Sequence, residues 1–232
     1  DCVRMVNQNR NVFASCMVAC GDADALVTGL TRAFNVAYED VTRAIAPKAR
    51  RQVFGINVLL HRGGTLFIAD TQIHELPSAE VIADIAEQAA EFARGMGHEP
   101  RVALLSFSSF GNPPRERAMR IREAIEVLDA RKPDFEYDGE MQVSVALNYP
   151  LMQELYPFCR LSGPANVLVM PALHAANIST QLMQELGSGT MIGPLLHGLS
   201  CPAQIVGLGA SVNGLVNAAA LAAYSALSDR LG

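Results

Sequence analysis

Near its end the chain reads Gln204-Ile205-Val206-Gly207-Leu208-Gly209-Ala210-Ser211-Val212-Asn213-Gly214-Leu215. The first residues form a short apolar run typical of a buried strand, and the glycines at 207 and 209 permit a tight turn. Ser211 is suited to cap a helix, because its hydroxyl can accept a hydrogen bond from a first-turn N–H group. This stretch therefore predicts a strand, a turn and a helix in immediate succession, the repeating unit of α/β folds.

The same alternation continues along the whole chain. Short apolar runs are separated by longer amphipathic ones, which is typical of an α/β fold with a mixed, mostly parallel sheet and flanking helices. Arg62-Gly63-Gly64 joins two of the runs and predicts a hairpin, the antiparallel element. Helices are expected over residues 1–20, 78–95, 114–131 and 212–231, and strands over 25–28, 53–61, 65–70, 102–106, 136–141, 167–170, 190–196 and 204–207.

Composition excludes several classes of protein. Half of the 232 residues are hydrophobic, which is enough for a buried core, and the net charge of −5 argues against nucleic acid or an anionic membrane as a partner. No apolar run reaches the roughly 20 residues of a membrane helix, and the start lacks a signal-peptide layout. Five cysteines without framework spacing indicate reduced thiols and a cytoplasmic protein. Because the chain begins inside an expected helix with Asp1, not methionine, we expect a fragment.

Four loops follow predicted strands and carry polar residues or glycines. Ligands of open α/β sheets collect beyond the carboxyl ends of the strands, so these loops are candidate binding sites. The candidate ligand-binding residues are Ser108, Ser109, Phe110, Gly111, His174, Asn177, Gly193, Pro194, Gly207 and Leu208.

Each loop also has a structural interpretation. Residues 106–113 either cradle an anion with hydroxyl and backbone N–H groups or form a capping turn closed by prolines. His174 either faces a cleft together with Asn177 or is a structural histidine on an apolar turn. Residues 193–198 are either a hinge between lobes or a bent strand. Ser211 is better explained as a helix cap than as a nucleophile.

Familiar catalytic and metal motifs are missing from the sequence. There is no P-loop, no Gly-x-Gly-x-x-Gly and no Gly-x-Ser-x-Gly. Cys16 and Cys20 are one helical turn apart, but no histidine or carboxylate cluster accompanies them, so we expect buried helix cysteines and not a zinc site. Asp138 and Glu140 are expected to be solvated carboxylates. The sequence therefore predicts no metal site.

The stretch of residues 163–178, Gly-Pro-Ala-Asn-Val-Leu-Val-Met-Pro-Ala-Leu-His-Ala-Ala-Asn-Ile, resembles a motif of phosphate acetyl/butyryltransferases, and residues 22–29, 101–106 and 192–199 are similar to other parts of that family. The resemblance implies an isocitrate/isopropylmalate dehydrogenase-like fold with two lobes around a cleft. One lobe is expected to contain residues 1–50 with 200–232 and the other residues 51–199. About the first third of the family domain is missing, which agrees with the expected fragment.

Finer details resemble one branch of that family. The sequences at 108–111, 70–71 and 138–141 are similar to the phosphotransacetylase-like domain at the C-terminus of bacterial NADP-dependent malic enzymes. This resemblance implies a regulatory domain that binds acetyl-CoA or a related CoA ester, and a homo-oligomer, a dimer or larger. The parent enzyme would convert malate to pyruvate with NADP and a divalent metal, Mg²⁺ or Mn²⁺.

The catalytic side chains of the family are replaced in this chain. The resemblance places a serine, an arginine and an aspartate at positions where this chain has Gly207, Leu208 and Gly214. Acyl transfer to phosphate needs a base and positive charge, which these residues do not supply. Arg32 lies near an early loop where an arginine would help.

We therefore expect no catalysis by this domain, and whether the chain is an enzyme stays open. The alternatives are an active phosphate acetyl/butyryltransferase that uses other residues, such as His174, His197 or Arg160, and a structural dimerisation module.

Overall fold

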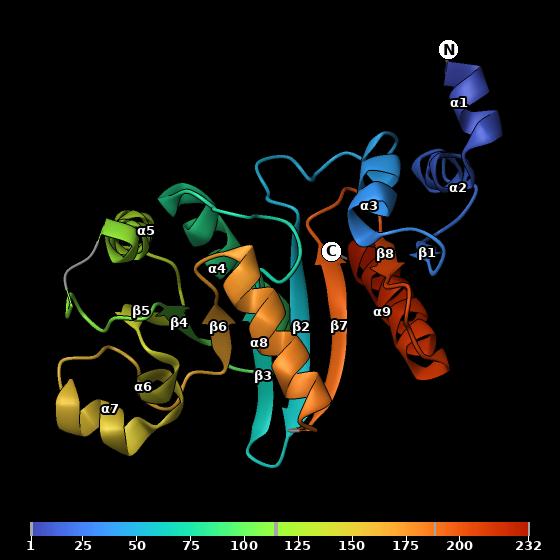
Figure 1. Cartoon of the computed structure of the whole chain (residues 1–232). Coiled ribbons are helices and arrows are strands. Elements are labelled where there is room, and N and C mark those ends of the chain that lie inside the picture. Colours follow the sequence, from blue (N-terminus) through green and yellow to red (C-terminus); the bar gives the residue numbers. More distant parts are fainter. Residues whose placement is uncertain (1, 114–115, 188, 232) are drawn as a thin grey trace. The chain divides into compact units, whose positions relative to one another are not determined.

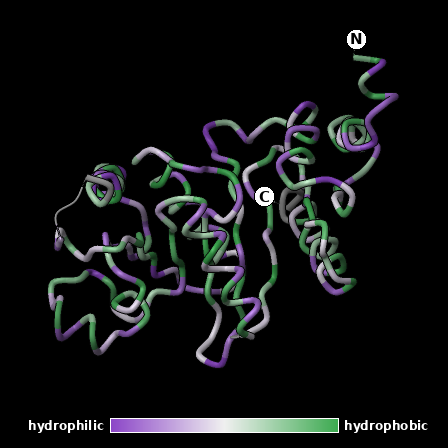
Figure 2. Tube along the Cα trace, viewed as in Figure 1, coloured by the Kyte–Doolittle hydropathy of each residue, from purple (hydrophilic) through white to green (hydrophobic). Residues whose placement is uncertain are grey.

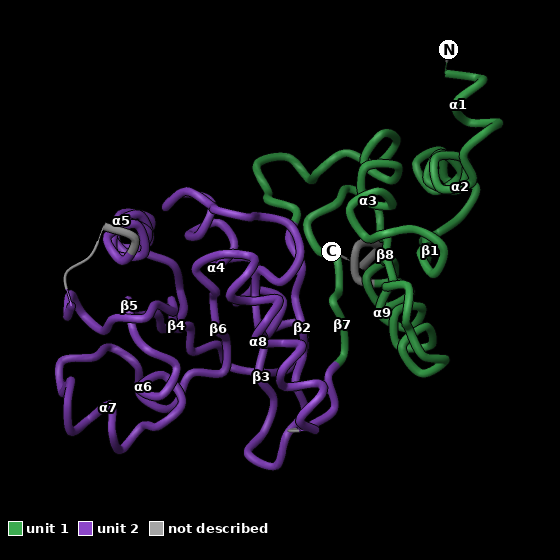
Figure 3. Tube along the Cα trace, in the orientation of Figure 1, with its two compact units in different colours: residues 1–53, 192–232 green, residues 54–191 purple. Residues whose placement is uncertain are grey.

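The computed structural model describes residues 2–113, 116–187 and 189–231. It divides into two compact units, which Figure 3 colours separately. Unit 1 comprises Asp1–Val53 and Ile192–Gly232, and unit 2 comprises Phe54–Met191. Unit 1 is thus built from both ends of the sequence, whereas unit 2 is continuous.

The sheet that organises unit 2 is mixed and mostly parallel, as the sequence predicts. Its strands within unit 2 follow the order β5-β4-β6-β3-β2, and β7 lies at the β2 edge but crosses into unit 1 at Ile192. β2 pairs with β3 as an antiparallel hairpin, whose turn is hydrophilic in Figure 2. The pairs of β3 with β6, β6 with β4 and β4 with β5 are parallel. The strands are β2 (Phe54–His61), β3 (Gly64–Ala69), β4 (Arg101–Leu105), β5 (Glu136–Met141), β6 (Val167–Val169) and β7 (Thr190–His197).

Helices cover both faces of this sheet, because its central strands β3, β4 and β6 are apolar on both sides. The Phe67 ring points to one face and contacts Phe92 of α4 with ring centroids 6.0 Å apart. The adjacent Ile68 points to the other face and belongs to a buried cluster with residues of α6, α7 and α8. Figure 1 shows these helices, which are α4 (Ala79–Gly95), α5 (Glu116–Arg131), α6 (Val143–Leu147), α7 (Tyr149–Leu155) and α8 (Leu173–Glu185).

Unit 1 contains a small parallel sheet of β1 and β8. Helix α9 packs on both strands, and its buried side chains include Ala218 and Ala222, which explains the alanine-rich sequence. The elements of this unit are α1 (Cys2–Gln8), α2 (Arg10–Ala19), β1 (Leu26–Gly29), α3 (Phe34–Thr42), β8 (Ala203–Val206) and α9 (Val212–Leu231).

All eight predicted strands are confirmed, and the helix predicted at 78–95 begins after Ser78, whose hydroxyl accepts a hydrogen bond of 3.3 Å from the Val81 N–H. The helix expected at 1–20 is instead two helices, because the Asn9 side chain caps a second one. The expected burial of Cys20 was wrong, since this thiol is exposed. No described helix is both long and apolar enough to cross a membrane.

Candidate functional site

The loops that leave β1 and β8 in unit 1 begin side by side. Gly29 lies opposite Val206 in the parallel register, so the two strands end together. A Cβ atom at residue 29 would clash with the carbonyl oxygen of Val206, and the φ of Gly29 is +124°. Only glycine fits this close approach. The geometry therefore brings the loop after β1 against the turn that starts at Gly207.

The turn after β8 has the predicted strand, turn and helix form. The Ser211 hydroxyl accepts a hydrogen bond of 3.1 Å from the Gly214 N–H, which confirms it as a helix cap. A Cβ atom at Gly207 would meet no atom within 4 Å, and Leu208 is 62% exposed. The turn therefore has room for the side chains that the family places there, but its own residues supply neither a base nor a cation.

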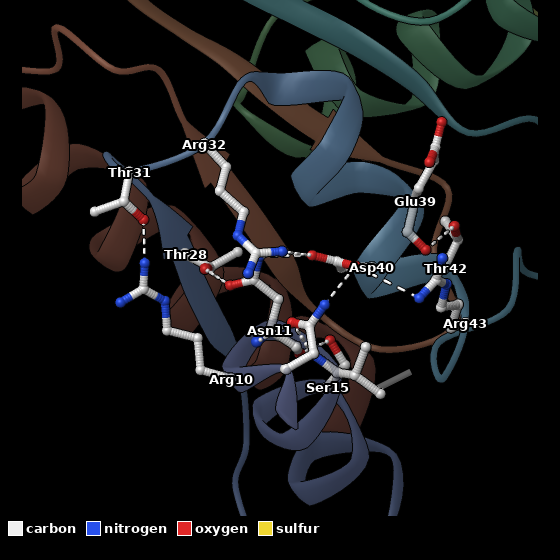
Figure 4. A network of polar contacts seen from close by, with 12 residues as sticks. Arg10, Asn11, Ser15, Thr28, Thr31, Arg32, Glu39, Asp40, Thr42 and Arg43 are labelled. Atoms are coloured by element: carbon white, nitrogen blue, oxygen red, sulfur yellow. Dashed lines mark hydrogen bonds and ion pairs between the residues drawn. The ribbon is translucent and has the colours of Figure 1, made fainter. Parts of the chain in front are cut away.

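A buried carboxylate near this turn was not predicted from the sequence. Asp40 of α3 is 4% exposed and accepts hydrogen bonds from Arg32 (2.9 Å), Asn9 (2.7 Å) and Asn11 (3.1 Å), as Figure 4 shows in part. Arg43 lies 3.8 Å from the same carboxylate. The available signal was the position of Asp40 on the buried side of a helix, where a charge needs partners.

In unit 2, the loop after β4 surrounds a carboxylate of the protein itself. Ser108 is completely buried, and its hydroxyl donates a hydrogen bond of 2.7 Å to Oε1 of Glu140. The Gly111 N–H donates to the same oxygen over 3.1 Å, and Nε of Arg122 lies 3.1 Å from Oε2. In this structure the hydroxyl and N–H groups predicted to cradle an anion thus contact Glu140.

The expectation that Asp138 and Glu140 are solvated was wrong. Asp138 is 5% exposed and Glu140 is 0% exposed. Each can be buried because hydrogen-bond donors of the protein replace water. The Arg160 N–H donates a hydrogen bond of 2.8 Å to Asp138, and the 106–113 loop donates hydrogen bonds to Glu140.

The other two predicted residues of this loop anchor it to neighbouring segments. The Ser109 hydroxyl accepts a hydrogen bond of 3.0 Å from the N–H of Gln142, at the end of β5. The Phe110 ring lies 4.9 Å from the Tyr156 ring and 5.0 Å from the Phe158 ring, between centroids. The loop is therefore braced on two sides within unit 2.

His174 and Asn177 both lie in α8, not on a turn. His174 lines a pocket of about 630 Å³ whose wall is mostly apolar and includes Leu168 and Met170. The Asn177 side chain instead accepts a hydrogen bond of 2.8 Å from Gln181 and does not line this pocket. Whether the two residues share a ligand site stays a prediction.

The segment that contains Gly193 and Pro194 is a strand. Both residues lie inside β7, which continues to His197. Of the two interpretations of residues 193–198, a hinge or a bent strand, the structure shows a strand. The proposed contact of these residues with a ligand stays a prediction.

A second buried carboxylate that the sequence did not reveal fixes the loop after β3. Asp70 is 4% exposed and accepts hydrogen bonds from backbone N–H groups, including those of Gly55 (2.8 Å) and Gln72 (2.9 Å). The His74 ring lies 2.7 Å from it, and the His74 carbonyl accepts a hydrogen bond of 3.2 Å from Leu173 at the start of α8. Asp70 thus sets the position at which α8 begins.

Tyr137 of β5 provides a pH-dependent prediction. Burial and the hydrogen bond of 2.6 Å to Asp129 raise the pKa of Tyr137 to about 12, against the opposing effect of Arg160. The folded state therefore favours the neutral hydroxyl, and this stabilisation is complete below the ordinary pKa of 10.0 and is lost as the pH rises through about 12. Ultraviolet titration should show one of the five tyrosines ionising near pH 12. The step should disappear in Tyr137→Phe, and a wild-type profile with every tyrosine near pH 10 would contradict the assignment.

Comparisons with known proteins agree with this geometry. The phosphate acetyl/butaryl transferase family matches residues 1–223. The NADP-dependent malic enzyme of Rhizobium meliloti is 55% identical over 97% of this chain and 30% of its own length. The phosphate acetyltransferase of Thermoanaerobacterium thermosaccharolyticum is 34% identical over 93% of this chain and 69% of its own. A phosphotransacetylase structure from Streptococcus pyogenes superposes with a TM-score of 0.88 at 29% identity, over 94% of this chain and 67% of that one.

Proposed function

Because the chain belongs to the phosphate acetyl/butaryl transferase family and is most of a domain that malic enzymes share, we propose that it binds acetyl-CoA as a regulatory domain and does not transfer the acetyl group. The chain spans only 30% of the Rhizobium meliloti relative, so the activity of the longer protein is part of the proposal. That activity is the oxidative decarboxylation of malate to pyruvate with NADP.

The observation that carries the proposal is the turn after β8. Its backbone keeps the strand, turn and capped helix. The resemblance to the family puts its reactive side chains where this chain has Gly207, Leu208 and Gly214. Removing one electrostatic contact to a transition state costs a rate factor of about 10² to 10³. Without all three reactive groups, the turn supports the binding of acetyl-CoA better than the transfer of its acetyl group.

NADP and the divalent metal, Mg²⁺ or Mn²⁺, are proposed for the malic enzyme portion of the longer protein. Within the described residues, no three His, Cys, Asp or Glu side chains are grouped so that they could hold a metal ion. The residues present therefore do not fit the metal, and no step in this chain is assigned to it. A cytoplasmic location is proposed from the cysteines, all of which are free.

Calorimetry with acetyl-CoA, combined with an acetyl phosphate assay on the same sample, tests the proposal. We expect binding without acetyl phosphate formation. At a ligand concentration 100 times the dissociation constant, binding should add about 2.7 kcal/mol to the free energy of unfolding. Turnover would favour the transferase interpretation. The absence of any heat or thermal shift with CoA esters would favour a purely structural module.

We also propose that the chain assembles as a homo-oligomer, at least a dimer. Helix α8 exposes Ile178 (58%) and Leu182 (55%), and Leu186 (80%) follows at its C-cap, beside the apolar pocket of unit 2. A ridge next to a groove is the geometry of a self-complementary interface. Sedimentation velocity should show a species larger than the 24.9 kDa monomer, and a monomer at every concentration would remove this part of the proposal.

A further inference from the structure

Unit 1 gathers positive charge at one end of β1. Arg32 follows this strand and Arg43 follows α3, and both contact Asp40, while Arg10 at the start of α2 reaches the residue before Arg32 (Figure 4). Three guanidinium groups against one buried carboxylate leave the cluster positive, although the whole chain has a net charge of −5. The neighbouring Glu39 is exposed, and its side chain points away from Arg32 in Figure 4.

Asp40 holds Arg32 in place without neutralising the cluster. Nη1 of Arg32 lies 2.9 Å from Oδ2 of Asp40, and the same carboxylate also accepts hydrogen bonds from Asn9 and Asn11. One negative charge is thus shared among several donors. The Arg32 side chain remains 36% exposed, so its guanidinium is both held and accessible to an anion from solvent.

A second guanidinium is held beside the first. Nη2 of Arg10 donates a hydrogen bond to the hydroxyl of Thr31, the residue before Arg32. The end of the strand is itself tied to α2, because the Thr28 hydroxyl donates a hydrogen bond of 2.7 Å to Asn11. Arg10 thus contacts the loop that carries Arg32, and the backbone at the start of this loop is fixed, which lowers the entropy lost when an anion binds.

This loop is the neighbour of the turn that carries Leu208. Gly29 and Val206 are opposite each other in the register, and the Leu30 N–H lies 3.5 Å from the Val206 carbonyl oxygen. Leu208 follows Val206 by two residues, and Arg32 follows Gly29 by three. A cation that the chain does not have after β8 is thus available from the adjacent loop after β1.

We propose that Arg32 and Arg10 form a binding site for a diphosphate group, and that Asp40 is the residue that positions Arg32. A planar guanidinium group can donate two parallel hydrogen bonds to phosphate oxygens, and two such groups match the two phosphates of a diphosphate. The identification of this group with the diphosphate of a CoA ester rests on the proposed function. The proposal of an anion site does not depend on the proposed function, because it is argued only from the contacts of Arg32, Arg10 and Asp40.

Isothermal titration of the full chain with inorganic pyrophosphate, and separately with acetyl-CoA, tests the site. Arg32→Gln and Arg10→Gln should each weaken pyrophosphate binding by about tenfold or more, the loss expected for a charge-assisted hydrogen bond. Arg32→Lys, which keeps the charge but not the fork of donors, should also weaken it. The matched control is Arg4→Gln, which removes the same charge from an exposed helix of unit 1 and should change the affinity less than twofold.

Asp40→Asn separates positioning from simple charge. This substitution makes the cluster more positive, so non-specific attraction alone predicts tighter pyrophosphate binding. Loss of the fixed Arg32 geometry predicts weaker binding, which is the expected result. Circular dichroism confirms that each variant is folded, and if Asp40→Asn or Arg32→Gln unfolds, the exposed Arg10→Gln decides the question.

The outcomes distinguish this inference from the proposed function. Pyrophosphate binding that Arg32→Gln and Arg10→Gln weaken supports the site, even if acetyl-CoA does not bind and the proposed function fails. Acetyl-CoA and pyrophosphate binding that neither variant weakens overturns the site while the proposed function stands. Binding of neither ligand by the wild-type chain overturns both.

Discussion

Acetyl-CoA and phosphate are expected to yield no acetyl phosphate with the wild-type chain, whereas the triple variant Gly207→Ser, Leu208→Arg, Gly214→Asp is expected to gain at least a hundredfold over that background. The three side chains would restore a hydrogen-bond donor, a cation for the anionic substrate and a base. Each such contact contributes a rate factor of about 10² to 10³ when it acts in the transition state. A coupled assay of acetyl phosphate formation measures the gain.

The backbone of the turn accepts these side chains. A Cβ atom at Gly207 meets nothing within 4 Å, and one at Gly214 would lie at an ordinary contact distance of 3.5 Å from the Ser211 hydroxyl. Leu208 is 62% exposed, so an arginine at that position stays solvated. The triple variant should therefore fold like the wild type, and its activity reports on chemistry, not on stability.

Gly209→Ser is the matched control for the triple variant. Gly209 has the same open surroundings as Gly207 but does not stand at a position where the family places a reactive side chain. This variant should stay inactive. Clear turnover by the wild-type chain would contradict the prediction directly. A triple variant that folds but forms no acetyl phosphate would show that the chain lacks further groups that the reaction needs, beyond these three side chains.

Glu140→Ala is expected to destabilise unit 2 by about 1–3 kcal/mol, the usual cost of leaving a buried hydrogen-bond donor without its acceptor. The Ser108 hydroxyl, the Gly111 N–H and the Arg122 guanidinium would all lose the carboxylate that they contact. Because Glu140 is 0% exposed, water does not replace it without a rearrangement of the 106–113 loop. Urea unfolding followed by circular dichroism measures the change.

Two further variants make the Glu140 experiment specific. Glu140→Gln keeps an oxygen for the loop but loses the charge opposite Arg122, so it should cost less than the alanine variant. Glu123→Ala removes an exposed glutamate from α5 and should change the free energy of unfolding by less than about 0.5 kcal/mol. Equal stabilities of Glu140→Ala and Glu123→Ala would refute the role of Glu140 as the brace of the loop.

The strands were predictable because their signal is local. Most are short apolar runs that need no knowledge of distant residues, as in β2, β3, β4 and β6, and the hairpin turn between β2 and β3 adds its own local signal. The short helices α6 and α7 span 5 and 7 residues, too few for a helical period to emerge from the sequence. They were missed for that reason.

The polar interior was not predictable, because its partners are far apart in the chain. Glu140 is buried by a loop that comes earlier in the chain, and its partner Ser108 lies 32 residues before it. In α2 the buried side includes Asn11 and Ser15, while Phe13 is 50% exposed, the reverse of what hydropathy alone indicates. Asn11 is buried because its side chain donates a hydrogen bond to Asp40 on another helix.

The pairing of β1 with β8 governs the order in which the protein is assembled. These strands are separated in sequence by the whole of unit 2, so their sheet closes a long loop. Unit 2 is continuous in sequence and lies between the two strands, from Phe54 to Met191. Once it has folded, it shortens the effective loop between the two strands and lowers the entropy cost of joining them. The β1–β8 pair of unit 1, beside its cluster of arginines, is thus made cheaper to close by the folding of unit 2.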